Sequence, residues 1–166
     1  METTRCRPAG AALLALGLAV LAAPAAAQED TGFEVNIVLS AKAAATLAAR
    51  HEAMVIMVDY YGWPKKGSQK HADEMGQIGF GPSRDIPIPG IAGRYAVPAV
   101  RLDPQHLGWL EGPVQVNVNI ASARKSSDDN LLDCDIIDGP LAEARQAPKT
   151  LACKLIGEAT GTPAKP

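Results

Sequence analysis

The sequence contains few aromatic residues, few charges and no cluster of basic residues. Seven of its 166 residues are aromatic and 20% are charged, with 16 Lys and Arg against 18 Asp and Glu. A charge balance this close to neutral argues against a nucleic-acid-binding protein, which would present a basic stripe. It also argues against a polybasic protein of the membrane surface. The hydrophobic fraction of 47% is too high for a disordered chain, and the length favours one domain.

The sequence also lacks the short motifs of common catalytic and cofactor sites. It has no Gly-x-Ser-x-Gly nucleophile elbow, no His-Glu-x-x-His metal motif and no glycine fingerprint of a phosphate-binding loop. Residues 79–83 resemble a nucleophile elbow only superficially, because Pro82 and Arg84 interrupt the pattern. We therefore expect a protein without a cofactor that is not an enzyme.

The N-terminus has the pattern of a secretory signal peptide. Arg5 and Arg7 precede an uncharged Ala/Leu/Val run over residues 11–23, which Pro24 ends. Residues 25–27 are alanines, the small side chains that a signal peptidase requires. The sequence therefore predicts a cleaved signal peptide over residues 1–27 and a secreted, periplasmic protein. An uncleaved N-terminal anchor is the alternative, although the run is short for a membrane-spanning helix.

The rest of the chain contains no second apolar run of this kind, so we expect no integral membrane segment after cleavage. A lipid anchor is rejected because Cys6 precedes the apolar run instead of following it. No twin-arginine pair is present, which favours general secretion.

Two cysteines remain after cleavage, Cys134 and Cys153. An even pair in an exported protein predicts one disulfide. The alternation of apolar residues places Cys134 on the same strand face as Leu132 and Ile136, so we expect both cysteines to face the core. No Cys-x-x-Cys motif supports a redox or metal role.

Period-two alternation of apolar residues dominates the chain and predicts strands. The run over residues 53–61 is nearly continuous and indicates a central strand covered on both faces. Short helices are expected after Ser40 and Asp103, which are good N-cap residues. The other expected strands cover residues 33–39, 95–100, 114–121, 131–137 and 149–156.

This pattern predicts a mainly β protein over residues 28–156. We expect a single antiparallel β-sandwich, immunoglobulin-like or transthyretin-like, with about seven strands and one or two short helices. A small closed barrel is the alternative architecture. Residues 157–166, rich in Gly, Pro, Ala and Thr, are expected to form a flexible tail.

A polar strand face and nearby aromatic residues form the first candidate binding surface. Gln115, Asn117 and Asn119 alternate with the valines of one strand and share its other face. Tyr61, Trp63 and Trp109 lie near strand or loop ends and could provide a stacking platform. These residues suggest recognition of an envelope protein, a peptide or a glycan. The alternative interpretation is a solvent-exposed sheet face without a ligand, with the aromatic residues in the core.

A second candidate lies in the polar connection over residues 62–75. His71, Asp73, Glu74 and Met75 combine an imidazole, two carboxylates and a thioether. Such a set could hold a divalent or cuprous metal ion. The alternative interpretation is an ordinary solvated loop.

The acidic segment over residues 128–138 is the third candidate. Asp133 and Asp135 are expected to share one strand face, and Asp128, Asp129 and Asp138 flank them. Paired carboxylates occur in glycoside hydrolases, but an exposed acidic face that opposes edge-to-edge pairing is the alternative.

The sequence thus favours a small, exported, non-enzymatic binding or accessory protein that recognises a protein, a peptide or an envelope component. A periplasmic metal-binding accessory protein using residues 71–75 is the alternative function, and a hydrolase using residues 128–138 is the third. No nucleic-acid partner is expected.

Overall fold

The computed structural model describes residues 31–159 and is mainly β, with two sheets and three helices. The expected signal peptide and residues 160–166 lie outside the described residues. No helix within residues 31–159 is long and apolar enough to cross a membrane.

The smaller sheet has four strands in the order β5-β1-β9-β7. Its strands are Phe33–Leu39 (β1), Gly93–Val97 (β5), Leu132–Cys134 (β7) and Lys149–Leu155 (β9). Strands β1 and β9 are parallel, so the prediction of a purely antiparallel arrangement is wrong. Alternation identifies strands without giving their direction, and the long chain between these two allows parallel pairing.

The larger sheet has five strands in the order β3-β2-β6-β8, and β4 also pairs with β2. Its strands are Met54–Pro64 (β2), Ile78–Gly79 (β3), Arg84–Ile88 (β4), Leu110–Ser122 (β6) and Ile137–Pro140 (β8). The long antiparallel pair of β2 and β6 is its centre. Strand β4 contains Pro87 and pairs with β2, which agrees with the tendency of proline to stand at sheet edges.

The two sheets contribute to one hydrophobic core. It contains Val35 and Ile37 from β1, Ile56 from β2, Val118 from β6 and Leu151 from β9, all at most 2% exposed. Along β2 buried and half-buried residues alternate, so the expectation that both faces of this strand are covered is wrong. The half-buried face, which includes Asp59, is the outer face of the larger sheet.

Three short helices connect or cover the strands: Ala41–Ala49 (α1), Pro104–Leu107 (α2) and Leu141–Gln146 (α3). The N-cap predictions are confirmed, because the side chains of Ser40 and Asp103 accept hydrogen bonds from the first turns of α1 and α2. A single 3-10 turn, Gln69–His71 (η1), lies in the connection after β2.

The strand expected over residues 131–137 does not exist as one strand. Strand β7 ends at Cys134, and β8 begins at Ile137 in the other sheet. The apolar alternation continues through this crossover, so it concealed the change of sheet. The same split raises the strand number above the expected seven within the described residues.

The Cys134–Cys153 disulfide is present and joins two residues that are directly opposite in the β7–β9 ladder. Cys153 is buried, whereas Cys134 is half-buried. Ile136 is 57% exposed because β7 has already ended, so its predicted position on the core face is wrong.

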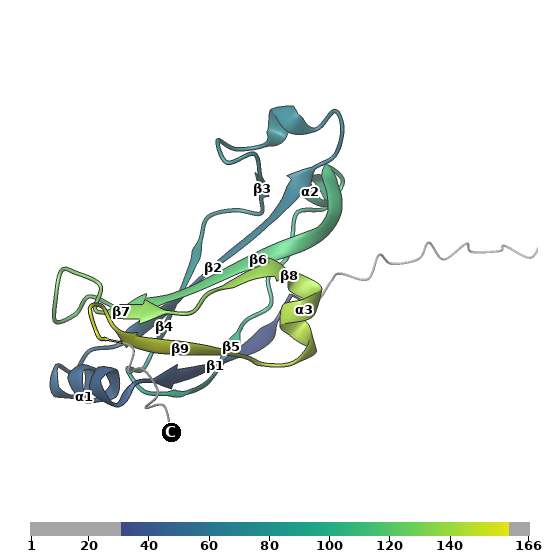
Figure 1. Ribbon diagram of the computed structural model, residues 1–166. Coiled ribbons are helices and arrows are strands. Elements are labelled where there is room, and N and C mark those ends of the chain that lie inside the picture. The colour runs from purple at the N-terminus through teal and green to yellow at the C-terminus, as the bar shows by residue number, and fades with distance from the viewer. Residues whose placement is uncertain (1–30, 160–166) are drawn as a thin grey trace, which may run out of the picture.

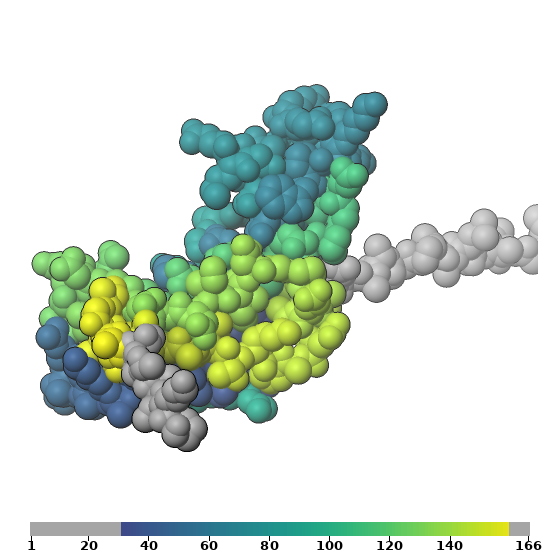
Figure 2. Space-filling view, viewed as in Figure 1, coloured from purple at the N-terminus to yellow at the C-terminus, as the bar shows by residue number. Residues whose placement is uncertain are grey.

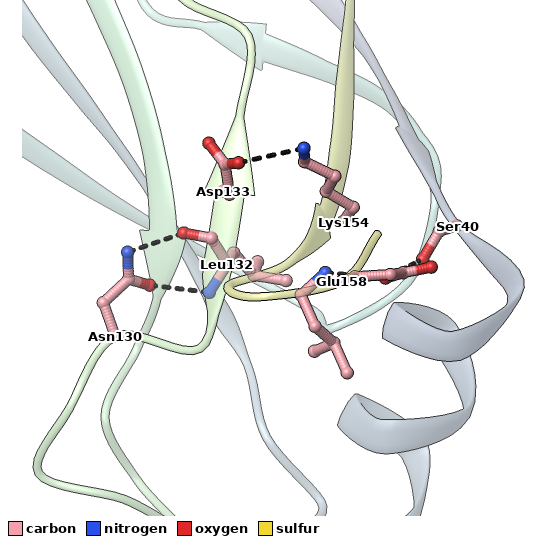
Figure 3. A network of polar contacts seen from close by, with 7 residues as sticks. Ser40, Asn130, Leu132, Asp133, Lys154 and Glu158 are labelled. Atoms are coloured by element: carbon pink, nitrogen blue, oxygen red, sulfur yellow. Dashed lines mark hydrogen bonds and ion pairs between the residues drawn. The ribbon is translucent and has the colours of Figure 1, made fainter. Parts of the chain in front are cut away.

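Polar contacts fix the end of the smaller sheet next to α1 (Figure 3). Lys154 pairs with Asp133 at 3.3 Å. Glu158 accepts hydrogen bonds from the Ser40 hydroxyl and from the amide of Leu155. The start of the C-terminal segment is therefore attached to the N-terminus of α1.

One end of the β2–β6 pair extends beyond the rest of the molecule (Figures 1 and 2). There it meets η1, β3 and α2, and together these segments form a projecting lobe of residues 61–81 and 104–114. The connection expected from residue 62 begins only after Pro64, because β2 runs further than its apolar pattern.

Candidate functional site

A pocket of about 430 Å³ lies where the lobe meets the outer face of the larger sheet. Four separate parts of the chain line it: residues 59–61, residues 73–81, Asn117 and Asp138. We call it the lobe pocket. It brings together residues from all three candidate regions of the sequence: Tyr61 and Asn117, Asp73 and Met75, and Asp138.

The floor of the lobe pocket is a row of polar residues across three neighbouring strands. Asp59 of β2 is opposite Asn117 of β6, and Asn117 is opposite Asp138 of β8. Directly opposed residues share a sheet face and lie about 5 Å apart at their Cβ atoms. An amide is thus set between two carboxylates at fixed spacing on rigid strands.

Each of the three pocket carboxylates accepts hydrogen bonds from neutral groups. The Tyr61 hydroxyl donates to Asp138 at 2.7 Å, and the Ser83 hydroxyl donates to Asp59 at 3.1 Å. Asp73 accepts from the backbone amides of Met75 and Gln77, at 2.9 Å each. Among the described residues that line the pocket none is basic. The pocket is therefore preorganised and negatively charged.

The environment of Tyr61 keeps its hydroxyl protonated. Burial, the hydrogen bond to Asp138 and the charge of that carboxylate together raise the pKa of Tyr61 to about 12. The phenol therefore remains a hydrogen-bond donor throughout the physiological range.

The three aromatic residues of the expected platform divide into two groups. Tyr61 and Trp63 form an edge-to-face pair with ring centroids 5.9 Å apart, and Trp63 is 47% exposed. Trp109 packs on two histidines of the lobe, stacking on His71 at 3.8 Å and on His106 at 4.9 Å. Trp63 thus remains open to a ligand, whereas Trp109 stabilises the lobe.

The three side-chain amides expected on one face of β6, Gln115, Asn117 and Asn119, also do not act together. The side chain of Gln115 donates to the Pro113 carbonyl, and that of Asn119 accepts from the amide of Ile120. Of the three expected amides, only Asn117 lines the lobe pocket.

The residues expected to bind a metal ion do not converge on one point. His71 stacks on Trp109, Glu74 is exposed, and only Asp73 and Met75 line the lobe pocket. Within residues 31–159 no group of three or more His, Cys, Asp or Glu side chains could hold a metal ion. The metal-site hypothesis gains no support from this geometry.

The acidic segment lies along two further cavities. One, of about 750 Å³, extends from Cys134 to Pro140 and is bordered by α3 and β9. The other, of about 540 Å³, lies between the ends of β1, β7 and β9. Asp133 and Asp135 do not share a strand face as expected, because β7 ends between them. Instead Asp133 pairs with Lys154, and Asp135 accepts from the amide of Ala152.

Sequence reasoning missed Asp59 and Gln77 as members of the site. Asp59 is the single charged residue in the apolar run of residues 53–61, and this signal could have identified it. Gln77 has no such signal, because only the fold of the lobe brings it to the pocket.

Comparisons with protein-family models, with curated proteins and with solved structures found no match to this chain. The geometry of the described residues is therefore the basis for the function.

Proposed function

We propose that this chain is an exported, periplasmic, non-enzymatic binding protein that recognises a protein, a peptide or another envelope component through the lobe pocket. In this proposal the two packed sheets form a β-sandwich scaffold, immunoglobulin-like or transthyretin-like, that presents the lobe. The signal-peptide pattern of residues 1–27 and the Cys134–Cys153 disulfide agree with an extracytoplasmic location.

The convergence of four chain segments on one pocket is the observation that supports this function most. The pocket floor belongs to strands β2, β6 and β8, and the loop around Asp73 forms its wall. Hydrogen bonds already fix Asp59, Asp73 and Asp138. Ligand binding would therefore cost little conformational entropy at these side chains, which is the advantage of a preorganised surface.

The chemistry of the lining favours binding over catalysis by a Ser, Cys or Lys nucleophile. Among its described residues are carboxylates, amides, tyrosines and Met75, but no Ser, Cys, Lys or His. These lining residues therefore provide no Ser, Cys or Lys nucleophile with a neighbouring histidine base. Carboxylates and amides suit recognition of polar ligands through hydrogen bonds. Trp63, which does not line the pocket but contacts Tyr61 edge to face, adds an exposed ring for stacking.

Site-specific crosslinking in the producing cell tests the proposal. A benzophenone amino acid would be incorporated at Met75, which lines the pocket and is 76% exposed. The matched control would have it at Asp128, an exposed position in the β6–β7 connection. We expect ultraviolet light to produce a discrete adduct from position 75 and none from position 128. The same weak background at both positions would overturn the proposal.

A further inference from the structure

We propose that the lobe pocket is one end of a longer groove that binds an extended peptide segment with basic side chains. This inference rests on the proposed binding function and names the class of its ligand. It derives from three adjoining cavities, from their charge and from the edge strand β8 that borders them.

The three cavities adjoin one another, since neighbouring cavities share lining residues. Asp138 lines both the lobe pocket and the 750 Å³ cavity. Cys134 and Asp135 line both the 750 Å³ cavity and the 540 Å³ cavity. The three adjoining cavities, which we call the groove, therefore follow one another from the lobe past β8 and β7 to Ser40 at the start of α1.

The groove has a strong excess of negative charge. Six carboxylates and two lysines, Lys149 and Lys154, line it. Lys154 is already paired with Asp133, as Figure 3 shows. The excess of four negative charges in the groove is larger than the net charge of −2 of the whole chain. A ligand with several positive charges is thus its electrostatic complement. The six carboxylates are Asp59, Asp73, Asp133, Asp135, Asp138 and Glu143.

The border of the groove favours an extended polypeptide over a small cation. Strand β7 is the last strand of the smaller sheet, and β8 is the last strand of the larger one. An edge strand presents backbone donors and acceptors to which another strand can bind. On β7 the Asn130 side chain already bonds the amide and the carbonyl of Leu132. An extended segment would therefore pair with β8, over residues 137–140.

Each cavity also contains one exposed apolar side chain. Met75 lies in the lobe pocket, Ile136 in the 750 Å³ cavity and Val38 in the 540 Å³ cavity, with exposures of 76%, 57% and 40%. An extended peptide directs alternate side chains to opposite sides. A segment in which basic and apolar residues are interspersed would therefore satisfy both kinds of contact.

Fluorescence anisotropy with defined peptides tests this proposal on the full exported chain. The probe would be a labelled ten-residue peptide in which Lys alternates with Thr and Val, and the control peptide would have Glu in place of Lys. We expect the Lys peptide to bind, with affinity that falls as salt increases, and the Glu peptide not to bind.

A pair of matched variants shows where the peptide binds. Asp138→Asn combined with Glu143→Gln removes two charges from the groove, and the amide oxygen introduced at position 138 can still accept a hydrogen bond from Tyr61. Asp128→Asn combined with Asp129→Asn removes two charges from an exposed loop outside it. The groove variant should weaken binding tenfold or more, and the loop variant less than twofold. Equal weakening by both would overturn the proposal, since only net charge would then matter.

Three further outcomes would also overturn it. A capped single lysine that binds as tightly as the ten-residue peptide would exclude an extended groove. Absence of Lys-peptide binding, while the adduct at Met75 persists in cells, would refute the basic ligand and leave the proposed binding function intact. Absence of both would refute the two proposals together.

Discussion

Replacing Glu52 by glutamine should destabilise the protein at neutral pH and destabilise it less in acid. Glu52 is 4% exposed and lies between α1 and β2. Its carboxylate accepts hydrogen bonds from the amides of Ala53 and Lys125, at 3.1 and 3.0 Å, and from the amide and hydroxyl of Ser126. It thereby fixes the connection between β6 and β7 on the end of α1.

The size of this loss of stability follows from the pKa of Glu52. Burial alone would raise it, but the hydrogen bonds from Ser126, Lys125 and Ala53 outweigh burial and lower the pKa to about 2, from an ordinary value of 4.5. At about 1.4 kcal/mol per pKa unit this shift corresponds to about 3 kcal/mol. Solvent screening near the loop surface reduces it to about 2 kcal/mol. A loss of that size should lower the melting temperature by about 8 °C.

The sign of the pH dependence is fixed because the folded-state pKa lies below the unfolded-state value. The stabilisation is complete above pH 4.5 and is lost as the pH falls toward 2. By about pH 3 the difference between the wild type and Glu52→Gln should therefore shrink to less than half.

Urea denaturation at pH 7 and pH 3, followed by tryptophan fluorescence, measures the loss of stability in Glu52→Gln and its dependence on pH. Glu111→Gln is the control, since Glu111 is an exposed carboxylate on β6. A Glu52→Gln protein as stable as the wild type at pH 7, or a deficit that is equal at both pH values, would refute this explanation.

Three more predictions concern Gly90, the disulfide and Tyr61. A Cβ atom at position 90 would lie 2.0 Å from the carbonyl oxygen of Glu52, so Gly90→Ala should lower the free energy of unfolding, measured in urea, by about 2 kcal/mol or more. Gly139→Ala, with open space around it, should lower it much less, and equal losses would contradict the reasoning. Reducing Cys134–Cys153, which closes a loop of about 20 residues, should lower the free energy of unfolding by about 3 kcal/mol; a melting temperature unaffected by dithiothreitol would show that the bridge adds nothing. Asp138→Asn should move the pKa of Tyr61 down from about 12, as measured by ultraviolet titration against a Tyr61→Phe blank, and an unchanged titration would exclude Asp138 as a cause.

Local chemistry made part of the fold predictable from the sequence. Ser40 and Asp103 mark the starts of α1 and α2 because their side chains accept hydrogen bonds from the first turn. The alternation of residues 114–121 predicts β6 because one of its faces is buried. Each of these features depends on residues close together in the chain.

The candidate site could be predicted only in pieces, because it depends on contacts between distant segments. Tyr61 and Asn117 were identifiable as polar or aromatic residues on strands, and Asp73 as a loop carboxylate. Their meeting with Asp59 and Asp138 follows from the register of β2, β6 and β8, which alternation alone does not specify. The change of sheet after Cys134 was hidden for the same reason, and with it the position of Asp138.

Hydrogen–deuterium exchange tests the central claim most directly, namely that the lobe pocket is the binding site. The exported protein would be compared alone and with solubilised envelope from the producing cell. We predict slower exchange in residues 73–81 and 137–140, which line the pocket, and no change in residues 123–130 of the β6–β7 connection. Protection confined to residues 123–130, or to other segments away from the lobe pocket, would contradict the claim.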